Sequence, residues 1–350
     1  MDTTQGLARE ASPGPETAWT NPGLATAFTS GPVPDDRLAI GLLRTMALIR
    51  VFEDRTHELF QAGEMPGFVH LCAGQEAPAA GVVAALSEGD YIFSTFRNHG
   101  HALAKGVDPK RLMAELYARS TGTNGGRGGS MHVADHSVGL LASGAIVGAS
   151  PPLACGPALG SKLSGDGKVS VAFFGDGAMQ QGTTYEAMNL AAVWKLSVLF
   201  VCENNGFGQA TPISSVSPVE PYERARAHDI PGVKVDGQDA EEVYRVASWA
   251  VHRARGGEGP TVIEATTHSI HGGWEGETKK AHRAQRDRLF RHRDPLRVLR
   301  ERLVQRGALS EDGWEDMLDE AHEVVDEAVE FARRSSPPDA SDLEQIVYTS

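Results

Sequence analysis

Residues 169–208 read VSVAFFGDGAMQQGTTYEAMNLAAVWKLSVLFVCENNGFG, and they predict the centre of the fold. The apolar run 169–174 has the length and β-branched content of a buried strand. Residues 182–194 carry a helical pattern, and a second apolar run, 197–202, ends in the polar sequence ENN. This order predicts two parallel strands joined by a helix, with polar residues at the carboxyl ends of both strands. Open parallel sheets bind their ligands at that edge.

The turn after the first strand is rich in glycine and predicts a phosphate site. Backbone without Cβ atoms, opening into a helix, presents N–H groups to an anion. A dinucleotide site is one interpretation, but glycines at positions 175, 177 and 182 miss the G-x-G-x-x-G spacing. In addition, Asp176 would set a carboxylate against the diphosphate. A cation between the two removes that repulsion, and Mg²⁺ typically binds one or two protein carboxylates plus substrate phosphates.

A second oxygen ligand is available from the next strand. A right-handed crossover brings the carboxyl ends of the two strands together, and Asn205 lies at the end of the second one. Taken singly, Asp176 is an ordinary N-cap or turn residue, and the Asn-Asn-Gly sequence is an ordinary turn. The paired arrangement favours a site for Mg²⁺ and a diphosphate.

The GDG sequence followed by NN resembles the thiamine-diphosphate motif. Five further segments narrow the resemblance: Gly67-Phe68-Val69-His70-Leu71, Gly74-Gln75-Glu76-Ala77, Phe96-Arg97-Asn98-His99-Gly100, Gly128-Gly129-Ser130-Met131-His132 and Ile146-Val147-Gly148. In this order and spacing, over about residues 38–303, the chain resembles the alpha subunit of the heterotetrameric 2-oxo acid dehydrogenases of the pyruvate, acetoin and branched-chain type.

The resemblance implies an α/β fold, with a doubly wound parallel sheet flanked by helices and a helical extension at the C-terminus. We expect a flexible N-terminal arm over residues 1–36, a thiamine-diphosphate-binding α/β domain over 37–290 and the helical extension over 291–350. The arm is rich in proline and poor in large apolar residues. Residues 120–150 form a long glycine-rich stretch without periodicity, which predicts a functional loop.

Other elements follow from periodicity and turn residues. Strands are predicted over 90–93, 232–235 and 261–265. Helices are predicted over about 36–62, 74–86, 109–119, 151–163, 241–255, 295–305 and 311–333.

Composition excludes several classes of protein. The chain has 350 residues, of which 41% are hydrophobic and 23% charged, as is ordinary for a globular protein. A net charge of -13 argues against a nucleic-acid partner. Three cysteines are too few for a disulfide framework. No segment has the length of a membrane span, and the N-terminus lacks a signal-peptide pattern. We therefore expect a cytoplasmic protein that binds neither nucleic acid nor membrane.

The resemblance also implies a cofactor, thiamine diphosphate, and the residues that hold it. The expected ligands of Mg²⁺ are Asp176, Asn205 and the backbone carbonyl of Phe207. The expected cofactor-binding residues are Phe96, Arg97, Ala145, Val147, Gly175, Asp176, Gly177, Ala178 and Asn205. The expected catalytic residues are His70, Arg97 and His271. Phe96 stands where the family usually has tyrosine, so the ring is kept and a hydroxyl donor is lost.

In the resembling family a separate beta subunit supplies the glutamate that activates the cofactor. We therefore expect the chain to be inactive alone and to work as an α₂β₂ heterotetramer. It would decarboxylate a 2-oxo acid such as pyruvate and pass the acyl group to a lipoyl acyltransferase. Less favoured alternatives are an NAD-binding dehydrogenase and a non-catalytic subunit.

One departure from the family pattern concerns the acyl acceptor. After the strand at 261–265 the family usually reads H-G-H, and the second histidine helps to pass the acyl group to a lipoyl group. This chain has His271-Gly272-Gly273-Trp274, so glycine replaces that histidine. The sequence leaves three alternatives open: His271 or His282 takes over, the acceptor is a carrier thiol, or the acceptor is an aldehyde.

Overall fold

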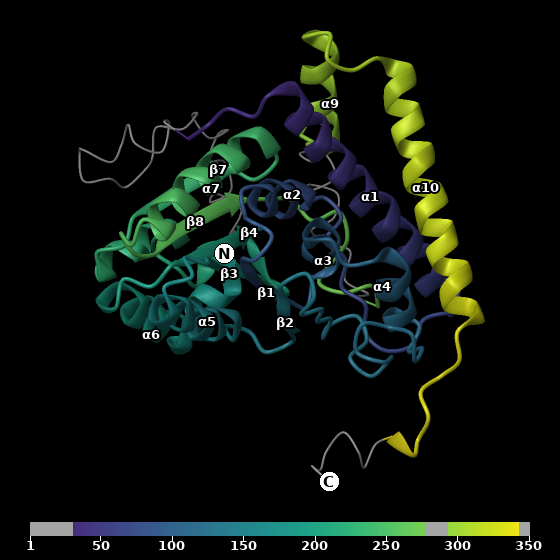
Figure 1. Cartoon of the computed structure of the whole chain (residues 1–350), viewed down its shortest axis with the longest axis horizontal. Coiled ribbons are helices and arrows are strands. Elements are labelled where there is room, and N and C mark those ends of the chain that lie inside the picture. Colours follow the sequence, from purple (N-terminus) through teal and green to yellow (C-terminus); the bar gives the residue numbers. More distant parts are fainter. Residues whose placement is uncertain (1–30, 277–292, 343–350) are drawn as a thin grey trace, which may run out of the picture.

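The computed structural model describes residues 31–276 and 293–342 of the chain (Figure 1). Its centre is a six-stranded parallel sheet in the order β2-β1-β3-β4-β8-β7. The strands are β1 Tyr91–Thr95, β2 Leu140–Gly144, β3 Ser170–Gly175, β4 Val198–Asn204, β7 Gly232–Asp236 and β8 Thr261–Thr266. After β1 the chain goes to one side for β2 and to the other side for β3 and β4. The switch point therefore lies between β1 and β3, where ligands of such sheets bind.

The two central strands bury both of their faces. On one face Val171 and Phe173 of β3 join Leu199 and Val201 of β4 in a core with helices α2 (Glu76–Ala84) and α7 (Ala240–Arg255). On the other face the alternate residues of the same strands, such as Phe174, pack with α5 (Ser150–Ser164) and α6 (Gly182–Val193). Continuous apolar runs suit strands that are covered on both faces, so the predicted doubly wound sheet flanked by helices is confirmed.

The first and last helices pack against each other outside the sheet. Helix α1 (Asp36–Gln61) begins at the N-cap Asp35, whose carboxylate accepts a hydrogen bond from the Leu38 N–H at 2.8 Å. Helix α9 (Pro295–Gln305) packs on α1, and α10 (Glu311–Arg334) packs on both α1 and α4 (Pro109–Leu116). Figure 1 shows α10 running beside α1. The described residues of the predicted C-terminal extension, 293–342, are thus mostly helical, while residues 1–30 of the predicted arm lie outside the described residues.

Two short elements differ from the sequence expectation. The predicted loop 120–150 contains β2, an edge strand that pairs with β1, and residues 94–101 contain the start of helix α3 (His99–Lys105). Strand β2 is largely half-buried and has no apolar alternation, and α3 is only seven residues long. Tertiary contacts rather than local pattern determine both. All three cysteines are buried and free.

None of the described helices is both long and apolar enough to cross a membrane. The cytoplasmic location stays a prediction.

Candidate active site

A cavity of about 490 Å³ lies at the carboxyl ends of the central strands, at the switch point of the sheet. Every predicted cofactor and metal residue lines it, as do His70 and Arg97. The predicted residues brought together in this way are His70, Phe96, Arg97, Ala145, Val147, Gly175, Asp176, Gly177, Ala178, Asn205 and Phe207.

The oxygen donors of the cavity follow two neighbouring strands. Asp176 begins a 3-10 turn (Asp176–Gln180) directly after β3, and its exposed fraction is 1%. Gly175 pairs with Glu203, so the ends of β3 and β4 are adjacent in the sheet. Asn205 follows β4, and its side-chain oxygen accepts a hydrogen bond from the Phe207 N–H at 3.1 Å. A buried carboxylate and an oriented amide oxygen thus meet at one edge, which is a donor set that suits Mg²⁺.

Two glycines allow backbone segments to approach each other at this edge. A Cβ atom on Gly177 would lie 3.4 Å from the Cα atom of Gly208, in the hairpin strand β5 (Phe207–Gly208). Gly148 has φ +84°, and a Cβ atom there would lie only 2.7 Å from the Gln181 Cβ atom. A side chain at Gly148 would push apart the loops around the cavity, whereas a Cβ atom at Gly177 would be in tight contact with the hairpin.

His70 and Arg97 also line the cavity. The His70 ring lies 4.7 Å from the Phe96 ring, between centroids. Arg97 donates from Nη1 to the Leu71 carbonyl at 2.5 Å and from Nη2 to the Gly273 carbonyl at 3.0 Å. Burial, with a smaller contribution from the charge of Arg97, lowers the pKa of His70 to about 4. The imidazole is therefore neutral at pH 7, so one ring nitrogen can donate a hydrogen bond to a ligand and the other can accept one.

Sequence reasoning missed Glu203, which also lines the cavity. Its Oε1 atom lies 3.1 Å from His101 Nε2, and His101 Nδ1 lies 2.7 Å from the hydroxyl of Ser94. The His101 ring stacks on Phe173 at 3.9 Å. A signal was available, because Glu203 belongs to the polar sequence ENN at the carboxyl end of a predicted strand, the edge where such sheets bind ligands. The arrangement extends a buried polar chain from the cavity into the protein.

Comparison with known proteins agrees with this architecture. The profile described as "Dehydrogenase E1 component" matches residues 44–341. The chain belongs to this family. It is 44% identical over 315 residues to the alpha subunit of acetoin:2,6-dichlorophenolindophenol oxidoreductase of Bacillus subtilis, covering 89% of this chain and 94% of that protein. It is 41% identical over 318 residues to the protein of the same description from Cupriavidus necator, covering 90% and 96%.

A pyruvate dehydrogenase relative is also similar. The chain is 36% identical over 302 residues to the pyruvate dehydrogenase E1 component subunit alpha of Rhizobium meliloti, covering 86% of this chain and 87% of that protein. The predicted family, fold and enzymatic character are thereby confirmed, and the family depends on thiamine diphosphate. The alternatives of an NAD-binding dehydrogenase and a non-catalytic subunit are not favoured.

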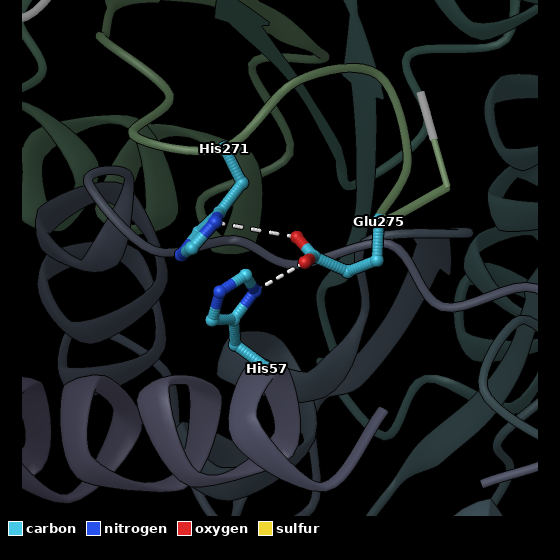
Figure 2. Close-up of side chains that lie close together, drawn as sticks. All are labelled: His57, His271 and Glu275. Carbon is cyan, nitrogen blue, oxygen red and sulfur yellow. Dashed lines mark hydrogen bonds and ion pairs between the residues drawn. The ribbon is translucent and has the colours of Figure 1, made fainter. Parts of the chain in front are cut away.

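His271 is the predicted site residue that the structure sets apart. Among the described residues lining the cavity, its loop contributes Gly273 and Trp274 instead. The His271 side chain lies beside His57 and Glu275 (Figure 2). Its catalytic role stays a prediction, and His282 lies outside the described residues.

Proposed function

We propose that the chain works as the alpha subunit of a thiamine-diphosphate-dependent 2-oxo acid dehydrogenase and holds the cofactor diphosphate through Mg²⁺. The observation that carries the proposal is the carboxylate of Asp176, which is almost fully buried beside a glycine turn at the switch point of the sheet. A buried carboxylate next to a diphosphate is costly unless a cation compensates both charges.

The residues of the cavity suggest how the cofactor is held. Asp176, Asn205 and the carbonyl of Phe207 would bind Mg²⁺, and two phosphate oxygens and a water would complete six ligands. The N–H groups of Gly177 and Ala178 would donate to the diphosphate. When bound, thiamine diphosphate supplies the nucleophilic carbon and the electron sink for breaking the bond next to the substrate carbonyl.

Other residues of the cavity would orient the substrate and the cofactor. The Arg97 guanidinium is fixed by main-chain carbonyls on two loops, so its positive charge stays at the wall of the cavity and can attract an anionic substrate. Neutral His70 can donate one hydrogen bond and accept another there. The loop that contains Ala145 and Val147 would offer backbone groups to the aminopyrimidine ring.

Exposed apolar side chains near the cavity support the proposal that a partner subunit binds there. Ile146, Val147 and Leu153 line the cavity, yet their exposed fractions are 74%, 46% and 50%. Phe68 is 57% exposed and packs edge-on against Trp274, which also lines the cavity. Apolar groups gathered at the rim of a site are typical of a protein–protein interface. We infer that a beta subunit covers this rim in an α₂β₂ heterotetramer.

The acyl acceptor belongs to the same proposal. A lipoyl group of an acyltransferase would receive the acyl group, as the resemblance implies. The loop next to the cavity places Gly273 and Trp274 at its wall rather than an imidazole. We therefore expect slow transfer to lipoyl groups unless a histidine is supplied.

The experiment uses the chain alone and the chain assembled with its beta subunit. Each sample receives thiamine diphosphate, Mg²⁺ and either pyruvate or acetoin, and the reduction of 2,6-dichlorophenolindophenol is measured. We expect turnover only in the assembled complex. Turnover by the chain alone would contradict the requirement for a partner. Turnover of neither compound by the complex, or of acetoin but not pyruvate, would contradict the proposed reaction, because acetoin is a hydroxyketone and not a 2-oxo acid.

A further inference from the structure

Two imidazoles and a carboxylate meet outside the cavity. His57 lies on α1, and His271 and Glu275 lie on the loop after β8 (Figure 2). Glu275 Oε1 is 3.3 Å from His271 Nδ1, and Glu275 Oε2 contacts His57 Nδ1. The two imidazole rings are 4.6 Å apart. One ligand atom of each residue lies within 4.8 Å of the other two, so the three side chains converge on one point.

The chemistry of these donors matches a transition metal. Zn²⁺ is bound by His nitrogen and carboxylate oxygen at about 2.0–2.2 Å, so tetrahedral donors lie about 3.4 Å apart. The distance between His271 Nδ1 and Glu275 Oε1 is 3.3 Å. Two neutral imidazoles and one carboxylate carry a single negative charge, which a divalent cation would compensate. Three protein ligands and one water would complete the set.

Burial and main-chain contacts hold the donors in place. The side chains of Glu275, His271 and His57 are 4%, 11% and 35% exposed. The Glu275 N–H donates to the Val69 carbonyl at 3.0 Å, which fixes the residue on the body of the protein. A preorganised set of donors loses little freedom when it binds a ligand.

We propose that His57, His271 and Glu275 form a binding site for a divalent transition metal of the Zn²⁺ class, separate from the proposed Mg²⁺ site. Imidazole nitrogens suit zinc, copper and nickel, whereas Mg²⁺ prefers oxygen ligands. The metal would join α1 to the loop 267–276. Arg97 holds the same loop through the Gly272 and Gly273 carbonyls, so the bound metal would stabilise the rim of the cavity.

The first test titrates Zn²⁺ into the full chain by calorimetry, without thiamine diphosphate and with Mg²⁺ in excess. We expect one Zn²⁺ per chain. The variants His57→Gln and Glu275→Gln should each weaken the affinity at least about tenfold, since even outer-shell partners of a metal contribute that much. His322→Gln, which changes an exposed histidine on α10, should bind Zn²⁺ like the wild type.

The second test measures hydrogen exchange of the loop 267–276. Zn²⁺ should slow exchange in the wild type and in His322→Gln but not in His57→Gln. Circular dichroism checks that each variant is folded. Absence of Zn²⁺ binding by the wild type would overturn the proposal whatever the variants do, and so would unchanged affinity in folded His57→Gln. Because no thiamine diphosphate is present, the result does not depend on the proposed function.

Discussion

A buried carboxylate on α4 holds the glycine-rich loop that reaches the cavity. Glu115 has an exposed fraction of 0%. Its Oε2 atom accepts hydrogen bonds from the N–H groups of Asn124 and Gly126 at 2.7 and 2.9 Å. Its Oε1 atom accepts from Gly128 and Gly129 at 2.7 and 3.0 Å. One side chain therefore satisfies four main-chain donors of the loop.

We predict that Glu115→Gln strongly destabilises the protein. The glutamine has almost the same shape, but its NH₂ group must face two of the four N–H donors. Each buried donor left unsatisfied costs about 1–3 kcal/mol. The expected loss in the free energy of unfolding is therefore about 2–6 kcal/mol. The loop also presents Met131 to the cavity, so cofactor binding should weaken as well.

Urea denaturation of the wild type and Glu115→Gln measures the loss. Glu186→Gln removes the same charge from an exposed position on α6, and such surface changes alter stability by at most about 0.5 kcal/mol. If Glu115→Gln loses no more stability than this control, the carboxylate does not organise the loop.

Two further predictions concern a histidine that lines the cavity, His70, and a position, Gly273, where a histidine can be introduced. Because the pKa of His70 falls from 6.5 unfolded to about 4 folded, its contribution to stability is complete above about pH 6.5 and is lost as the pH falls towards about 4. As the pH falls from about 6.5 to about 4, the urea midpoint of His70→Gln should fall less than that of the wild type. Equal decreases would contradict the lowered pKa of His70 in the folded protein. Gly273→His should raise acyl transfer to a lipoyl domain, where a positioned acid–base group typically contributes about 10²–10⁴-fold, without changing dye-coupled oxidation. The prediction would be refuted if the wild type already acylates the lipoyl domain as fast as it reduces the dye and the variant shows no gain.

The sequence was sufficient for the central strands because their side chains are buried on both faces. Strands β3 and β4 are almost continuous apolar runs, which are typical of a parallel sheet covered on both faces. Polar residues directly after these strands are then brought together by topology alone. The positions of Asp176 and Asn205 at one cavity edge could therefore be predicted.

Other features depend on contacts between distant parts of the chain. Strand β2 exists because β1 offers it an edge, and no local pattern predicts that. In the sequence Glu115 looks like an ordinary polar residue of an amphipathic helix. Its role depends on the loop that packs around it in the folded protein. His271 was expected in the cavity from the resemblance, but the loop turns its side chain towards His57. The spacing of His57 and His271 in the sequence does not predict that they are in contact.

Binding of thiamine diphosphate by the assembled complex can be measured by calorimetry with Mg²⁺ and again with EDTA. We predict that EDTA abolishes binding by the wild type. Asp176→Ala should remain folded and assembled but bind no cofactor in Mg²⁺, whereas Asp319→Ala, at an exposed position on α10, should bind like the wild type. Wild-type affinity in Asp176→Ala, or binding that survives EDTA, would show that this carboxylate does not hold the diphosphate through a metal ion.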